Sequence, residues 1–303
     1  MKPALEIKNL HKIYPSGTTA LANLSLTIEQ GEFFALLGPN GAGKTSLISI
    51  LAGPKRKTSG TIKVCGLDLD THREQAKFLL GIVPQEVTFD PFFTVNEALI
   101  LQSGYYGLRQ NQTYIDEILE KLGLADKKHS STRALSGGMK RRLLIAQALV
   151  HKPKIVVLDE PTAGVDVELR HGLWTYMKEL NKQGTTILLT THYLEEAEQL
   201  CHRTAIINQG QLIALDQTKK LIRSLGNKKS LTLSFKDPIK QIPPSLNPYT
   251  PQILDKYDLE ITFDQTDLQK ILAQIHKFDL TDLTLKSQNL EDVFIKLTHR
   301  DNA

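Results

Sequence analysis

One eight-residue segment constrains this chain more than any other. The segment from Gly38 to Thr45, GPNGAGKT, follows the apolar run Phe33–Leu37 and precedes the apolar stretch Thr45–Ala52. Glycines between a buried strand and a helix let successive backbone N–H groups converge on phosphate oxygens, and the helix N-terminus adds partial positive charge. The segment therefore predicts a nucleotide-binding loop, in which Lys44 contacts the β- and γ-phosphates and the Thr45 hydroxyl binds Mg²⁺.

Strand-like and helix-like segments alternate on both sides of a polar, mostly helical stretch. Buried strands are expected at Ile155–Leu158 and Thr185–Thr190, and helices at Met139–Val150 and Glu168–Asn181. This alternation is typical of an α/β fold with a largely parallel sheet between helices.

The pattern of predicted strands and helices changes near Gly226. The residues that follow predict strand, proline-rich loop, strand, helix, strand and a short helix. We expect one domain at residues 1–225, with a helical subdomain at about 86–134, and a small α+β domain at 226–303.

Composition excludes several classes of protein. No apolar run approaches the roughly 20 residues that cross a bilayer, and the first residues lack the apolar core of a secretion signal. The two cysteines of the chain, Cys65 and Cys201, have no metal-site spacing, which favours a reduced, cytosolic chain. A net charge of +4 is too slight to indicate nucleic acid as a partner.

Two carboxylates end the strand at Ile155–Leu158. Asp159 and Glu160 lie where open α/β sheets bind ligands, so Asp159 suits Mg²⁺ and Glu160 suits activation of the water that attacks the γ-phosphate. His192 follows the next strand, and Gln85 follows Gly81–Pro84. Taken alone, neither residue would indicate a site.

A second glycine pair opens the helix predicted at Met139–Val150. Leu135-Ser136-Gly137-Gly138-Met139 offers a good N-cap in Ser136 and two glycines that leave backbone N–H groups open. By itself this stretch predicts only a capped amphipathic helix. A chain with two phosphate-binding helix starts has little use for both unless two copies meet.

Over residues 4–220 the sequence resembles the ATP-binding subunits of ABC transporters, because the motifs occur in the family's order. Gly38–Thr45 resembles the Walker A motif, Leu135–Met139 the signature motif and Ile155–Glu160 the Walker B motif. Ala163–Asp166 resembles the D-loop, and Gln85 and His192 resemble the Q-loop glutamine and the switch histidine. Tyr14 is similar to the family's adenine-stacking aromatic residue. Met139 departs from the glutamine of many relatives. The sequences around the signature and Walker B motifs, and the C-terminal segment Asn289–Thr298, resemble those of one branch of the family. That branch powers drug, antibiotic and polysaccharide exporters.

The resemblance implies a P-loop NTPase with an ABC-type ATPase domain that hydrolyses ATP with Mg²⁺. It implies a head-to-tail dimer of two copies, a separate membrane permease that performs export, and a peripheral location at the cytoplasmic face of the cell membrane. The implied catalytic residues are Glu160, His192 and Gln85, and the implied metal ligands are Thr45, Gln85 and Asp159. The implied nucleotide contacts are Tyr14, Gly38, Pro39, Asn40, Gly41, Ala42, Gly43, Lys44, Thr45, Ser46, Ser136, Gly137, Gly138 and Asp166.

Other readings of the sequence are an importer ATPase, a DNA-repair ATPase, a translation-associated ATPase and a P-loop GTPase. A GTPase needs Asn-Lys-x-Asp, and the nearest string, at Asn181–Gly184, lacks the carboxylate. Repair ATPases insert a long coiled coil between their motifs, and translation-associated relatives usually carry two sets of motifs. No feature of the sequence indicates the transported substrate or the role of the C-terminal domain.

Overall fold

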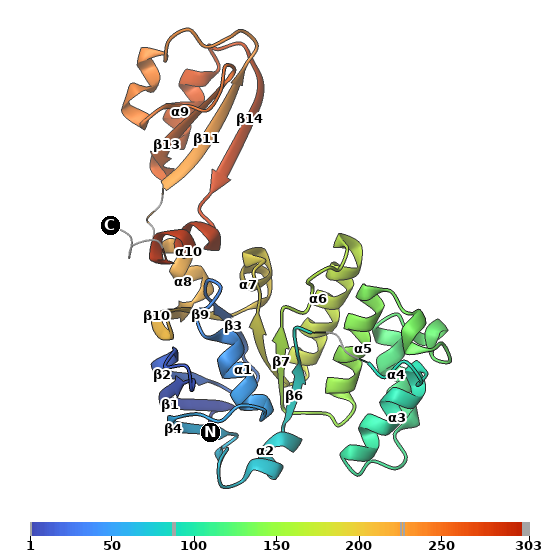
Figure 1. Ribbon diagram of the computed structural model, residues 1–303. Coiled ribbons are helices and arrows are strands. Elements are labelled where there is room, and N and C mark those ends of the chain that lie inside the picture. The colour runs from blue at the N-terminus through green and yellow to red at the C-terminus, as the bar shows by residue number, and fades with distance from the viewer. Residues whose placement is uncertain (1, 87–88, 225, 227, 299–303) are drawn as a thin grey trace. The chain divides into compact units, whose positions relative to one another are not determined.

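The computed structural model describes residues 2–86, 89–224, 226 and 228–298 (Figure 1). Contacts between residues divide the chain into two compact units, one running to Thr218 and the other spanning Lys219–Lys296. The boundary expected from the sequence, between residues 225 and 226, lies later in the chain than this division after Thr218. Residue 225 lies outside the described residues.

The central sheet of the first unit runs in the order β10-β9-β3-β8-β7-β6, and only the edge strand β10 is antiparallel to its neighbour. Every residue of β3, β7 and β8 is buried, as expected for aliphatic strands covered on both faces. The strands are β3 (Phe33–Leu37), β6 (Leu80–Val83), β7 (Ile155–Asp159), β8 (Thr186–Thr190), β9 (Arg203–Asn208) and β10 (Gln211–Gln217).

A separate antiparallel sheet, which the sequence analysis did not distinguish, runs in the order β2-β1-β4-β5. Its buried side chains share one hydrophobic core with β3 and with helix α1, to which Leu47 and Leu51 contribute. The core thus anchors the helix that follows the nucleotide-binding loop. The elements are β1 (Leu5–Ile13), β2 (Thr19–Ile28), β4 (Ser59–Val64), β5 (Leu67–Asp68), α1 (Lys44–Ala52) and α2 (Arg73–Phe78).

Helices α3, α4 and α5 gather beside the edge of the sheet that carries β6 (Figure 1). Thr94 and Glu97 form a reciprocal capping box at the start of α3. Helix α5 contacts α3, α4 and β6 and so connects the helical region to the sheet. The elements are α3 (Val95–Tyr105), α4 (Gln112–Lys121), η1 (Ala125–Lys127), η2 (Thr132–Ala134), α5 (Gly137–Leu149), α6 (Val167–Lys182) and α7 (Leu194–Leu200).

The second unit contains an antiparallel sheet in the order β12-β13-β11-β14. Alternate residues of β11 and β13 pack against α9 in a separate core that includes Leu231, Ile261 and Ile271. The proline-rich stretch, expected as a loop, contains η3 and β12. The elements are α8 (Thr218–Arg223), β11 (Lys228–Phe235), η3 (Pro244–Tyr249), β12 (Gln252–Ile253), β13 (Asp258–Asp264), η4 (Gln265–Asp267), α9 (Leu268–Ile275), β14 (Leu280–Ser287) and α10 (Leu290–Thr298).

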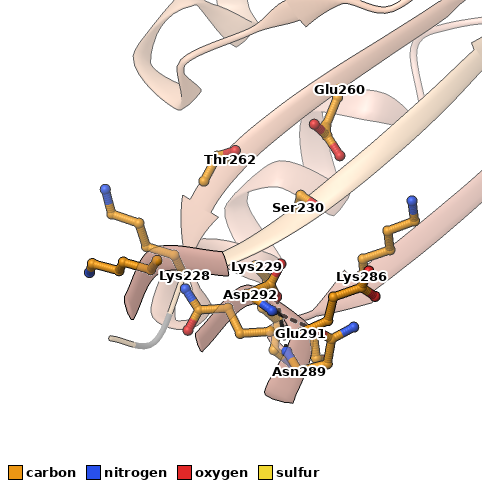
Figure 2. A pocket seen from close by; sticks show the side chains of 12 residues that line it. Lys228, Lys229, Ser230, Glu260, Thr262, Lys286, Asn289, Glu291 and Asp292 are labelled. Atoms are coloured by element: carbon orange, nitrogen blue, oxygen red, sulfur yellow. Dashed lines mark hydrogen bonds between the residues drawn. The ribbon is translucent and has the colours of Figure 1, made fainter. Parts of the chain in front are cut away.

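An open cavity of about 830 Å³ lies in the second unit, over the ends of β11, β13 and β14 and the start of α10 (Figure 2). Its charged lining mixes Lys228, Lys229, Lys286 and Lys296 with Glu260, Glu291 and Asp292. The charges nearly balance, and none of the nucleotide-site residues expected from the sequence lines this cavity.

Candidate active site

Two glycines of the Gly38–Thr45 loop, Gly38 and Gly43, are required by close backbone packing. Gly43 precedes α1 with φ 108°, and a Cβ on it would lie 2.4 Å from the Ala20 carbonyl oxygen. A Cβ on Gly38 would lie 2.4 Å from the Ile207 carbonyl oxygen. Both distances are far shorter than real Cβ contacts, so the strand-to-helix turn can be built only from glycine at these positions.

Lys44 lies back over the loop that precedes it. Its Nζ donates to the carbonyl oxygens of Gly38 at 2.5 Å and Pro39 at 3.0 Å. Burial lowers the pKa of Lys44, and the nearby carboxylates of Glu160 and Asp159 oppose that shift. The ammonium is therefore bound by two neutral carbonyl acceptors of the loop. An anionic acceptor would form a stronger hydrogen bond with it.

A cavity of about 150 Å³ brings the loop together with residues of two other strands. Its lining consists of Asn40, Gly41, Ala42, Gly43, Lys44, Thr45, Ser46, Gln85, Asp159 and Glu160. All of these residues were expected from the sequence, and the parallel sheet unites them because β3, β6 and β7 end at the same edge.

Asp159 and Glu160 have different surroundings at the end of β7. Asp159 is 4% exposed and accepts a hydrogen bond of 2.5 Å from Thr190 Oγ1, and burial raises the pKa of its carboxyl. Glu160 has φ 50°, a left-handed conformation that is uncommon outside glycine. Asp159 thus faces a buried, polar position, whereas Glu160 stands in a strained turn.

Gln85 and His192 converge on a single oxygen of Glu160. Gln85 Nε2 donates to Glu160 Oε2 at 3.1 Å, and His192 Nδ1 lies 3.4 Å from the same oxygen. The three residues expected to be catalytic therefore meet, although they follow three different strands, β6, β7 and β8. A carboxylate with two such neighbours is well placed to orient and deprotonate a water molecule.

The oxygen donors that face the cavity suit a hard divalent cation. Thr45, Gln85 and Asp159 all line it. Within the described residues there is no cluster of three or more His, Cys, Asp or Glu side chains that could hold a metal ion. This sparse donor set fits Mg²⁺, which commonly takes one or two carboxylates together with phosphate oxygens and water.

Tyr14 lies beside the cavity rather than in its lining. Its hydroxyl is 3.0 Å from Ser46 Oγ at the start of α1. The ammonium groups of Lys12 and Lys55 lie 4.8 Å and 5.3 Å from the ring centroid. The half-buried ring is thus fixed near the loop, with cations beside it.

The signature residues do not join the cavity. Ser136 Oγ accepts from Met139 N at 3.3 Å and caps α5, and a Cβ on Gly137 or Gly138 would meet nothing within 4 Å. Asp166 caps α6 by accepting from Leu169 N at 3.0 Å. In a single chain these residues serve as helix caps and an open glycine surface.

Arg141, on the helix that these glycines open, is a site residue that the sequence analysis missed. It is 2% exposed and donates to backbone carbonyls around the cavity, including that of Glu160 at 2.6 Å. Arg141 lies in a basic run, Lys140–Arg142, and such runs are typical of a solvated helix surface. The available signal was its spacing from Leu144, Ile145 and Ala148, which places it on the buried face of α5.

Comparisons with known proteins agree on one family. The profile described as ABC transporter matches residues 21–163. A Nod factor export ATP-binding protein I of Cupriavidus metallidurans is 36% identical over 99% of each chain. The linearmycin resistance ATP-binding protein LnrL of Bacillus subtilis is 35% identical over 98% of each chain.

Solved structures share the fold of the first unit. An ATP-binding subunit of an ABC transporter superposes with a TM-score of 0.69 and 29% identity, covering 74% of this chain and 93% of that chain. The cassette MJ0796, in a dimeric post-hydrolysis state bound to ADP and Pi, gives a TM-score of 0.64 and 25% identity, covering 70% and 98%. These findings confirm the fold and the family that the sequence motifs predicted: the chain belongs to the ABC transporter family, as an ATP-hydrolysing subunit of the type found in its exporters.

Proposed function

We propose that this chain binds Mg²⁺-ATP in the cavity behind Gly38–Thr45 and hydrolyses it with Glu160 as the general base. Two copies would assemble head to tail, and a separate membrane permease would use the cycle for export. The observation that carries the catalytic assignment is the convergence of Gln85 and His192 on one oxygen of Glu160, at the wall of the phosphate-sized cavity.

Each residue around the cavity has a distinct task in this proposal. The loop N–H groups and Lys44 bind the phosphates, and Lys44 exchanges its carbonyl acceptors for phosphate oxygens. Glu160 accepts a proton from the attacking water, while Gln85 and His192 orient the carboxylate. Tyr14 stacks on the adenine, since its ring is held near the loop through Ser46.

Thr45, Gln85 and Asp159 would hold Mg²⁺ in this cavity. The ion would supply positive charge beside the β- and γ-phosphates, where negative charge grows during phosphoryl transfer. The hydrogen bond from Thr190 fixes Asp159 so that its carboxylate faces the cavity.

A second copy of the chain would complete the site. Ser136, Gly137 and Gly138 form a helix start that has open space above it and lies outside the cavity lining. Such a helix start attracts anions, so it suits the γ-phosphate of a nucleotide bound by the other copy. Asp166, capping α6, would lie at the same interface. Hydrolysis would remove the shared phosphate and let the copies separate.

The membrane partner would contact the helical region. Large apolar side chains are exposed there, with Phe92 at 89% and Tyr105 at 73% exposure, joined by Ile100 and Leu101 on α3. Exposed apolar groups of this size are common at protein interfaces. Within the described residues, no helix has the length and apolar character needed to cross a bilayer. The relatives named as export ATP-binding proteins support a separate permease for the membrane passage, with this chain peripheral at the cytoplasmic face.

The substitution Glu160→Gln tests the catalytic and dimer assignments together. The variant should bind ATP normally and turn over about 1,000-fold more slowly, a typical loss for a general base. It should also accumulate as an ATP-bound dimer, seen by size-exclusion chromatography with light scattering. The exposed Glu195→Gln is the matched control and should behave as wild type. Turnover near the wild-type rate would remove Glu160 from the reaction, and a monomer at saturating Mg²⁺-ATP would contradict the shared site.

A further inference from the structure

The side chain of Arg141 crosses the base of the active site. Within the described residues its guanidinium group donates to five carbonyl oxygens, and each of its five N–H groups has an acceptor. Nε donates to Pro161 at 3.3 Å, Nη1 donates to Pro84 at 2.5 Å and Gln85 at 3.0 Å, and Nη2 donates to Glu160 at 2.6 Å and to Asp159.

Only arginine can make this set of bonds. Its donors form a rigid planar fork, whereas lysine has three donors on one atom. Burial lowers the pKa of Arg141, and the carboxylates of Asp159 and Glu160 oppose that shift. Removal of the guanidinium would take one donor from each of the five carbonyls. The bonds to Asp159 and Pro161 are buried, so the loss is costly there, whereas the Glu160 carbonyl would keep the bond from Ala163 N.

The five carbonyls belong to two segments that must act together. Pro84 and Gln85 follow β6, whereas Asp159 ends β7 and is followed by Glu160 and Pro161. Arg141 itself belongs to α5, which begins at the signature glycines. One side chain therefore connects the Gln85 segment, the Glu160 segment and the signature helix.

Glu160 needs such support because of its backbone conformation. A non-glycine residue at φ 50° is strained and persists only where its neighbours fix it. The Glu160 N–H donates to the Thr190 carbonyl at 2.9 Å. Its carbonyl accepts from Arg141 and from Ala163 N at 3.1 Å. Arg141 is the side chain that holds this turn.

We propose that Arg141 is a positioning residue for hydrolysis, which fixes the carboxylate of Glu160 relative to Gln85 and to the signature helix. This inference rests on the proposed function. It also gives the membrane partner a route to the catalytic base: a movement of the Gln85 segment shifts the carbonyls of Pro84 and Gln85, and Arg141 carries the shift to Glu160.

The next residue in the chain provides a matched control. Arg142 is 8% exposed and donates to the carbonyls of Leu122 at 2.6 Å and Gly123 at 3.0 Å. It shares the helix, the charge and the type of acceptor with Arg141. Among the described residues its hydrogen bonds go to the helical region, so its loss should affect stability without reaching Glu160.

The test compares Arg141→Gln, Arg141→Lys and Arg142→Gln in the full chain, assayed with Mg²⁺-ATP. For both Arg141 variants we expect kcat to fall about 100-fold, the loss typical of a misplaced catalytic group, with KM for ATP changed less than about twofold. Because binding persists while hydrolysis is slow, these variants should also accumulate the ATP-bound dimer. Arg142→Gln should keep kcat within about twofold of wild type.

Melting curves separate positioning from a purely structural role. Arg141→Lys retains the charge and part of the bonding, so it serves as the test if Arg141→Gln does not fold. Wild-type kcat in Arg141→Lys would overturn the inference. So would a loss of kcat that merely follows the loss of melting temperature along the trend set by Arg142→Gln. A wild-type chain that does not hydrolyse ATP, alone or with its membrane partner, would instead overturn the proposed function.

Discussion

The two glycine-bearing helix starts of this chain, before α1 and before α5, have opposite surroundings. At the first, a Cβ on Gly43 would lie 2.4 Å from the Ala20 carbonyl oxygen, and the loop forms the wall of the cavity that Asp159 and Glu160 share. At the second, Gly138 has nothing within 4 Å of a Cβ position. The first start is enclosed by its own chain, and the second is open.

This difference separates two reasons for a glycine. Gly38 and Gly43 are needed for the chain to fold, since backbone from β9 and β2 occupies the space that their side chains would take. The glycines at the start of α5 are not required by packing within the single chain, which agrees with the role in a dimer that we propose for them. Substitutions at the two starts should therefore affect different quantities.

The largest effect is expected at the enclosed start, for Lys44→Ala. The ammonium is already desolvated and bonded to loop carbonyls, so phosphate gains a charged donor at little further cost. Its removal should weaken ATP binding by about 3 kcal/mol, or roughly 100-fold. Equilibrium binding of a fluorescent ATP analogue measures this loss. Unchanged affinity would show that the loop does not bind the phosphates.

Gly43→Ala should damage the fold of the loop itself. A methyl group would meet backbone at a position with φ 108°, which costs about 2 kcal/mol of unfolding free energy. Denaturant titration without nucleotide measures the change. If the variant were as stable as wild type, the loop would be able to adopt another backbone path.

Gly138→Ala should lower turnover and leave the stability of the single chain unchanged, the opposite of Gly43→Ala. The single chain has room for the methyl group, so we expect unchanged unfolding free energy and unchanged ATP affinity. Turnover should fall about tenfold, which corresponds to about 1.4 kcal/mol in the activation barrier, because the methyl group would crowd the phosphate bound by the second copy. Steady-state ATPase assays test this, and full activity would argue that the open helix start is unused.

The smallest effect is expected for Asp159→Asn in the nucleotide-free chain. Burial raises the pKa of Asp159 in the folded state, so the folded chain binds a proton more readily than the unfolded chain. Stability then falls as pH rises from the ordinary aspartate range through the raised pKa. Asparagine keeps an acceptor for Thr190 without the charge, so the variant should be about 1 kcal/mol more stable at pH 7.

Denaturation without nucleotide and with a chelator checks this prediction at two pH values. The gain in stability should vanish in acid below the ordinary aspartate range, where Asp159 is protonated in both states. A variant that is less stable at pH 7 would show that the carboxylate is favourably solvated or paired in the free chain.

Elements with a strong local pattern were predictable from the sequence. The strand at Phe33–Leu37 has the predicted bounds, and the helix predicted at Thr45–Ala52 begins one residue earlier, at Lys44. Strand β12 was missed because a two-residue strand has no periodicity to detect. The antiparallel sheet around β1 was not separated from the central sheet, since pairing depends on partners far along the chain.

By itself, the sequence determined most of the chemical groups of the candidate active site, because glycine, lysine and carboxylate positions follow from the ends of buried strands. Only the tertiary structure decided how these groups meet. Gln85 and Glu160 are 75 positions apart and become neighbours through adjacent parallel strands. Arg141 acts on carbonyl oxygens, which every residue possesses, so no pattern of side chains could reveal its partners before the chain was folded.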